Sequence, residues 1–218
     1  MAWDIDRVMN ELFNRVNENY LKQSTQQGID TKLWLGVPIS ELRLLAKAIQ
    51  LDHLMGWSLW EMKIYECKVL SSMLMDPILI ADEDADYIVS GIDSWQMSEQ
   101  FCANLFRVCP NASSWAISWS DKKRLNTRIT GYQLIIAICT SNIVQPNNLY
   151  RSMMLAIRNT IVGDARPGIQ PLAIQALTAI SKKNLETKNF VTEVCVHLEK
   201  SGDRIAVAVA NTVEMNMK

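Results

Sequence analysis

A tryptophan and a carboxylate stand four residues apart in the segment DSWQMSEQFC, which covers residues 93–102. Because residues at i and i+4 share one face of a helix, Trp95 and Glu99 are predicted to be neighbours. A flat ring beside a fixed anion suits an electron-poor, cationic target such as an alkylated purine. The same residues also fit a core tryptophan beside a solvated glutamate, and the sequence leaves both interpretations open.

One reaction that such a pair could serve is cleavage of a glycosidic bond. A purine alkylated at N3 or N7 is already cationic, so it can leave without being protonated. A carboxylate near the sugar would stabilise the oxocarbenium-like transition state and act as a general base toward water. The adjacent aromatic face would favour the cationic base by roughly 0.5–2 kcal/mol.

The elements that must position this pair are predicted to be helices. The 218 residues include only 8 Gly and 6 Pro, and no segment alternates polar and apolar residues as a half-buried strand does. Apolar residues instead recur at helical spacing, with Asp93 and Gln96 forming a capping box before Trp95 and with Asp121 opening a later helix. The expected helices cover approximately residues 5–25, 39–49, 57–75, 82–91, 95–107, 112–119, 121–139, 146–160, 169–180, 187–198 and 203–214.

About ten helices with short connections and no heptad register favour an all-α fold, a HEAT-like helical-repeat solenoid in a single domain, residues 1–218. Repeats of that class are about 40–47 residues long, so the chain would hold roughly five. The internal repeats are weak in sequence. A compact, irregular bundle of the same helices is therefore the alternative.

Composition narrows the function classes. The N-terminus lacks the pattern of a secretory signal, and the uncharged run from residue 129 to 150 is too polar to span a membrane. The five cysteines are scattered without a CxxC pair and only two histidines occur, which argues against a disulfide framework and a zinc site. We expect a cytoplasmic monomer that uses neither metal nor cofactor.

Charge is distributed unevenly along the chain. Residues 1–110 carry 9 Lys/Arg and 16 Asp/Glu, whereas residues 111–190 carry 10 Lys/Arg and only 3 Asp/Glu. An excess of cations of this kind suits a surface that follows a phosphate backbone, although an ordinary fluctuation of charge is the alternative. The candidate DNA contacts are Lys122, Lys123, Arg124, Arg151, Arg158, Arg166, Lys182 and Lys183.

The segment WLGVPISELRLLAKAI, residues 34–49, resembles the N-terminal signature of the AlkD-like DNA alkylation repair family. The order of later features is also similar: LWEMK at 59–63, the tryptophan-led helix ending in Phe-Cys at 101–102, and the arginine-bearing segment KRLNTR at 123–128. The resemblance covers about residues 30–180 and lies in the order of these patterns.

The resemblance implies a HEAT-like solenoid that holds duplex DNA on a basic concave surface and releases N3- and N7-alkylpurines by N-glycosidic hydrolysis. It also implies that the lesion can stay stacked in the duplex. By position, Trp95 and Glu99 match the family's tryptophan and aspartate, and Arg128 matches an arginine that would hold a phosphate, with Arg124 as the second choice. The chain departs from the family in two ways. It has Glu where the family has Asp, and it lacks the further tryptophan that family members carry in the later helices, since Trp119 is the last tryptophan of the chain.

Two other functions are compatible with the same sequence. A helical-repeat protein of this fold could bind DNA, or another acidic partner, without base excision. A solenoid could also act as a protein–protein scaffold, since such folds expose long concave surfaces. Salt-dependent affinity for duplex DNA is expected of the DNA-binding protein and not of the protein scaffold.

Overall fold

The computed structural model describes residues 3–218, and all regular structure in that range is helical. The predicted all-α class is therefore confirmed. The described residues form thirteen α-helices and two short 3-10 helices, rather than about ten helices. The helices group into two compact units, residues 1–81 and 82–218. That the whole chain is one domain stays a prediction.

The first unit holds five α-helices and one 3-10 helix. They are α1 (Ile5–Phe13), α2 (Glu18–Gln26), α3 (Ile39–Ile49), α4 (His53–Trp60), α5 (Tyr65–Leu74) and the 3-10 helix Pro77–Leu79. Two long helices of the sequence prediction are each divided here. The 5–25 segment breaks where the Asn17 side chain caps α2 by accepting from the backbone N–H of Tyr20, and the 57–75 segment breaks at an extended Ile64.

A buried carboxylate binds the backbone just before the start of α3. Glu66 is fully buried in α5, and it accepts hydrogen bonds from the backbone N–H groups of Leu35 at 2.9 Å, Gly36 at 2.7 Å and Val37 at 3.1 Å. Gly36 has φ +92°, and a Cβ there would lie 3.0 Å from Cβ of Leu21. The Gly-Val-Pro sequence before α3 thus has a structural explanation.

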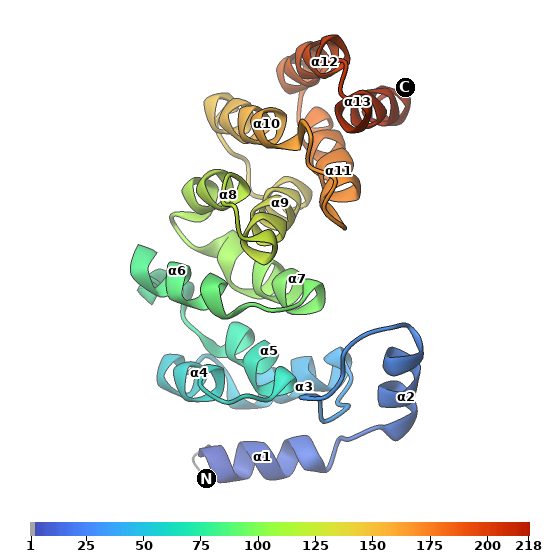
Figure 1. The fold of residues 1–218 in the computed structure, drawn as a ribbon. Helices are drawn as coiled ribbons and strands as arrows, with labels where there is room; N and C mark the ends of the chain where they lie inside the picture. The colour runs from blue at the N-terminus through green and yellow to red at the C-terminus, as the bar shows by residue number, and fades with distance from the viewer. Residues whose placement is uncertain (1–2) are drawn as a thin grey trace. The chain divides into compact units, whose positions relative to one another are not determined.

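The second unit stacks its helices in two rows (Figure 1). Helices α7 (Trp95–Asn104), α9 (Leu125–Thr140), α11 (Ile169–Ser181) and α13 (Arg204–Asn216) pack successively in one row. Helices α8 (Ala112–Ser120), α10 (Asn147–Ile161) and α12 (Leu185–Lys200) form the other row, and α6 (Asp82–Gly91) precedes α7. Each helix of the second row pairs with the next helix along the chain, as helical hairpins of a solenoid do.

Close approach between the rows depends on a glycine. A Cβ at Gly131 of α9 would lie 2.4 Å from the backbone nitrogen of Ser120, at the end of α8. Trp119 is buried beside this crossing, and its indole N–H donates to Asp86 of α6 at 2.9 Å. The rows are therefore held by backbone contact as well as by apolar side chains.

Three helix starts differ from the sequence prediction, and the first is that of α4, which begins at His53 rather than at Trp57. Ser94, not Asp93, caps α7, because its side chain accepts from the backbone N–H of Met97 at 3.3 Å. Helix α9 begins at Leu125, not at Asp121. Residues 121–124 consequently form the connection between α8 and α9. At its other end α7 stops at Asn104, and Phe106–Val108 is a separate 3-10 helix.

Candidate functional site

A pocket of about 200 Å³ opens on the surface of α7, α9 and α11. Trp95 and Glu99 both line it, the first half-buried and the second exposed. The structure thus brings the predicted pair to one accessible pocket, because one helical turn of α7 separates them. The remaining lining residues are Cys102, Ala103, Gln133, Ile136, Ala137, Thr140, Leu172 and Gln175.

The Trp95 ring lies against the connection between α10 and α11. Gly168 has φ +82°, and a Cβ at that position would be 3.2 Å from Cζ3 of Trp95 and 4.0 Å from Cδ1 of Ile129. The ring therefore approaches backbone that only a glycine leaves open. The starts of α7 and α11 meet at this point.

The pocket is mostly apolar, with a few polar groups among its lining residues. Glu99 carries the one formal charge among them, and no Lys or Arg lines the pocket. Gln133 is buried, 6% exposed, and its Oε1 has no hydrogen-bond partner among the described residues. Cys102 is also buried, and burial raises the pKa of its thiol, so it is not a nucleophile at neutral pH.

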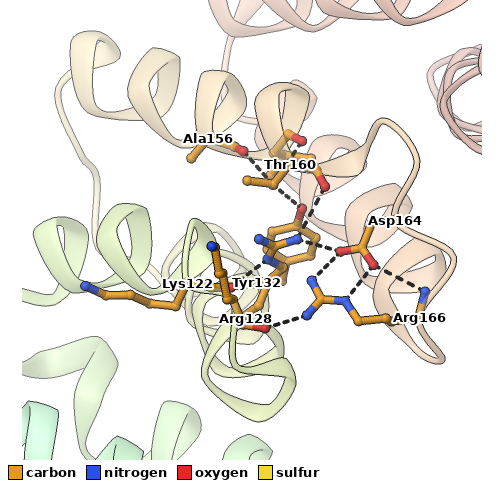
Figure 2. Close-up of polar contacts among 9 residues, drawn as sticks. Lys122, Arg128, Tyr132, Ala156, Thr160, Asp164 and Arg166 are labelled. Carbon is orange, nitrogen blue, oxygen red and sulfur yellow. Dashed lines mark hydrogen bonds and ion pairs between the residues drawn. The ribbon is translucent and has the colours of Figure 1, made fainter.

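Arg128, the predicted phosphate clamp, points its guanidinium into the protein (Figure 2). It is 9% exposed and does not line the pocket. Nη1 donates to Oδ2 of Asp164 at 2.6 Å and to the carbonyl of Thr160 at 3.4 Å, while Nε donates to the carbonyl of Lys122 at 3.0 Å. A phosphate clamp needs donors open to solvent, so this placement favours a structural role for Arg128.

Asp164 joins Arg128 to Arg166 (Figure 2). Arg166 donates from Nε to Oδ1 at 2.7 Å and from Nη2 to Oδ2 at 2.6 Å, and its Nη1 donates to the carbonyl of Lys123 at 2.6 Å. Hydrogen bonds from Arg166, and then from Arg128, outweigh burial and lower the pKa of Asp164 to about 2. The network fastens the α10–α11 connection, with Gly168, to the α8–α9 connection.

Sequence reasoning assigned both arginines to DNA and did not single out Asp164 as their partner. One signal was present, since Asp164 is one of only three acidic residues between positions 111 and 190. Because a buried charge needs a partner of opposite sign, such a lone carboxylate is a candidate partner for any buried cation of that region.

Three predicted DNA contacts gather in the α8–α9 connection. Lys122, Lys123 and Arg124 are exposed there, and we refer to these three residues as the basic edge. Arg124 also donates from Nη1 to the carbonyl of Val89 at 3.0 Å and from Nη2 to that of Ile92 at 3.1 Å. Since Ile92 lies three residues before Trp95, the basic edge adjoins the start of α7.

The other predicted contacts lie elsewhere. Arg151 and Arg158 belong to α10, in the second row, where Arg151 lies 4.8 Å above the Phe190 ring. Lys182 is exposed after α11, and Lys183 donates from Nζ to the carbonyl of Cys139 at 2.9 Å, at the end of α9. None of these four residues lines the Trp95 pocket.

Residues 3–218 contain neither a cluster of metal-binding side chains nor a membrane-spanning helix. No group of three or more His, Cys, Asp or Glu side chains there could hold a metal ion. No helix there combines the length and apolar character that a bilayer crossing requires.

The fold agrees with that of a known solved structure. That structure is described as representing a new family of proteins related to the HEAT-like repeat DNA glycosylases with affinity for branched DNA structures. The two chains superpose with a TM-score of 0.76 over 88% of this chain and 82% of the other. This chain has a HEAT-like repeat fold. At 16% identity the likeness establishes the fold alone, and the predicted HEAT-like class is confirmed by it.

Sequence comparison adds no family assignment. No protein-family model matches the chain, and no curated protein matches it. Membership of the AlkD-like family therefore stays a prediction.

Proposed function

We propose that this protein binds DNA through the surface of α7, α9 and α11, and that it hydrolyses the N-glycosidic bond of N3- or N7-alkylated purines there. The observation that carries the proposal is the pocket that Trp95 and Glu99 share beside the basic edge. The structural relative is described as having affinity for branched DNA structures, which supports the DNA-binding part of the proposal.

The basic edge supplies the contacts to phosphate in this proposal. Lys122 and Lys123 are exposed and lie just before the first residue of α9. A helix start carries partial positive charge, so the backbone of α9 adds to the attraction for a phosphate there. Phosphates bound at this edge would place a strand next to Trp95, since Arg124 is anchored to the backbone just before α7.

Glu99 is the group assigned to the reaction. An exposed carboxylate at the mouth of a pocket can approach the sugar of a nucleotide whose base contacts Trp95. Its negative charge would stabilise the oxocarbenium-like sugar, and the carboxylate can accept a proton from the attacking water. The leaving base is already cationic, so no general acid is required of this chain.

Binding is tested by removing the two lysines together. The Lys122→Ala/Lys123→Ala variant is expected to bind a 20-bp duplex about tenfold more weakly at low salt. The magnitude of the negative slope of log Kobs against log [salt] should decrease by about 2, because each phosphate contact contributes about 0.9. Lys188→Ala/Lys200→Ala on α12 is the matched control and should bind as wild type does. Duplex DNA and a four-way DNA junction are titrated in parallel. Equal salt slopes for Lys122→Ala/Lys123→Ala and for Lys188→Ala/Lys200→Ala would contradict the assignment of the basic edge as the phosphate contact.

Catalysis is tested on alkylated duplex. Wild-type protein should release 7-methylguanine, and Glu99→Gln should lower that rate by about 10²–10³, the loss typical of removing one electrostatic contact to a transition state. Glu99→Asp keeps the charge and should retain part of the activity. Because Glu99 is exposed, all three proteins should unfold at the same temperature. Equal background rates for wild type and Glu99→Gln would refute the hydrolase assignment.

A DNA-binding protein without excision activity is the second candidate. The guanidinium of Arg128 is buried and paired, which favours a structural role for this residue. The pocket contains no cation that could hold a phosphate beside Glu99. This candidate predicts salt-dependent binding that Lys122→Ala/Lys123→Ala weakens, with no release of 7-methylguanine. A protein scaffold predicts no duplex affinity at low salt.

A further inference from the structure

A groove lies between α10 and α12, which pack against each other in the second row (Figure 1). Asn147 is hydrogen-bonded to Glu186, and Arg151 lies above the Phe190 ring. In both pairs the second residue comes 39 positions after the first, so the two helices run in the same direction and in register. The groove has a volume of about 90 Å³ and lies outside the Trp95 pocket.

The charged side chains that line this groove have no partner of opposite sign. Arg151 and Glu193 are exposed, and Arg158 donates from Nε and Nη2 to the neutral Oδ1 of Asn159 at 3.1 and 3.0 Å. No ion pair within residues 3–218 includes Arg151, Arg158 or Glu193. A carboxylate in the groove would repel a phosphate backbone, so the groove suits a partner that carries both signs of charge better than it suits DNA.

The signs of the charges alternate along the two helices. Glu186 is level with Asn147, the first residue of α10. Counted in residues from that level, the charges are negative at 0 (Glu186), positive at 4 (Arg151), negative at 7 (Glu193) and positive at 11 (Arg158). A half-turn about an axis that crosses the helices midway exchanges 0 with 11 and 4 with 7. Every charge then lies opposite one of the other sign.

We propose that this groove is the interface of a homodimer, in which α10 and α12 of a second copy pack antiparallel across it. A two-fold interface joins the same surface of two copies, so that surface must be complementary to itself. Arg151 would pair with Glu193 of the partner subunit, and Arg158 with Glu186 of the partner subunit. The apolar groove residues Leu155, Phe190 and Val194 would lie close to the axis.

The available area suits a weak dimer. Helices of 15 and 16 residues are about 23 Å long, and two side by side are about 20 Å wide. Such a face buries roughly 900 Å² over both copies, which falls among weak, transient interfaces of less than about 1,200 Å². The monomer expected from the sequence is therefore replaced by a dimer that forms at high protein concentration and weakens with added salt.

Sedimentation equilibrium of the full chain tests this interface. The wild-type mass should rise from the 24.8 kDa of one chain toward twice that value as the concentration approaches about 1 mM. Arg151→Glu and Glu193→Arg should each weaken self-association at least about tenfold, because each variant places like charges opposite one another. An equal mixture of the two variants should associate as wild type does, since each supplies the charge that the other lacks.

The matched control is Arg204→Glu, at an exposed position at the start of α13 and outside the groove, which should associate as wild type does. All three replaced side chains are exposed, so the variants should unfold at the wild-type temperature. A wild-type mass of 24.8 kDa up to about 1 mM, or a mixture that stays monomeric, would overturn the proposal. Arg151→Glu that binds duplex DNA more weakly while wild type stays monomeric would refute the dimer and assign Arg151 to DNA.

Discussion

Replacing Asp164 with alanine should lower the free energy of unfolding by about 3–5 kcal/mol, the cost of leaving a buried charge without its partner. Asp164 is 8% exposed and accepts from both Arg128 and Arg166. Its removal leaves the Arg128 guanidinium buried among carbonyl groups without a compensating anion. Urea unfolding at pH 7, followed by circular dichroism, measures the loss.

The same carboxylate predicts how stability depends on pH. The pKa of Asp164 is about 2 in the folded chain against an ordinary value of 3.8, so the folded state favours the ionised form. The stabilisation is therefore fully present above about pH 4 and is lost as the pH falls through 2. Unfolding free energies of wild type and Asp164→Ala should converge across that range.

The control for this experiment is Asp121→Ala. Asp121 is an exposed residue at the end of α8 in the connection to which Arg166 is bonded, and its removal should change stability by less than about 0.5 kcal/mol. If Asp164→Ala proved as stable as Asp121→Ala, the network would not hold the two connections together. The base-release and binding assays on Asp164→Ala would then be expected to match wild type.

Local spacing was sufficient to predict the Trp95–Glu99 pair. Both residues lie on α7, and their approach to one another depends on a single helical turn. The all-α class was predictable for the same reason, since amphipathic spacing and capping residues are local signals. What the sequence could not supply was the pocket around the pair, because Gln133 and Leu172 reach it from α9 and α11.

The roles of the basic residues depended on contacts between distant segments. Arg128 and Arg158 both lie within predicted helices, yet Arg128 is buried by its pairing with Asp164, 36 residues away. The exposure of Lys122 and Lys123 depends on where α9 starts, which the pattern placed at Asp121. Helix boundaries at 14–17 and 61–64 were also missed, because apolar spacing continues across both breaks.

Replacing Glu66 with alanine should destabilise the chain by about 3–5 kcal/mol, because three backbone N–H groups lose their shared acceptor. Oε1 serves Gly36 and Val37, and Oε2 serves Leu35. Glu66→Gln keeps one acceptor oxygen and turns an NH2 group toward a donor, so its loss should be smaller than that of Glu66→Ala. Thermal and urea unfolding of the two variants measure this order.

Glu18→Ala is the control, since Glu18 is an exposed residue of the same unit whose side chain is 83% accessible. Equal stability of Glu18→Ala and Glu66→Ala would show that Glu66 does not hold residues 35–37. The expected large difference would explain why Gly36, Val37 and Pro38 precede α3, since their backbone must fit a buried carboxylate. The segment that carries the family resemblance is then a requirement of the fold, whereas function is tested at Glu99, Lys122 and Lys123.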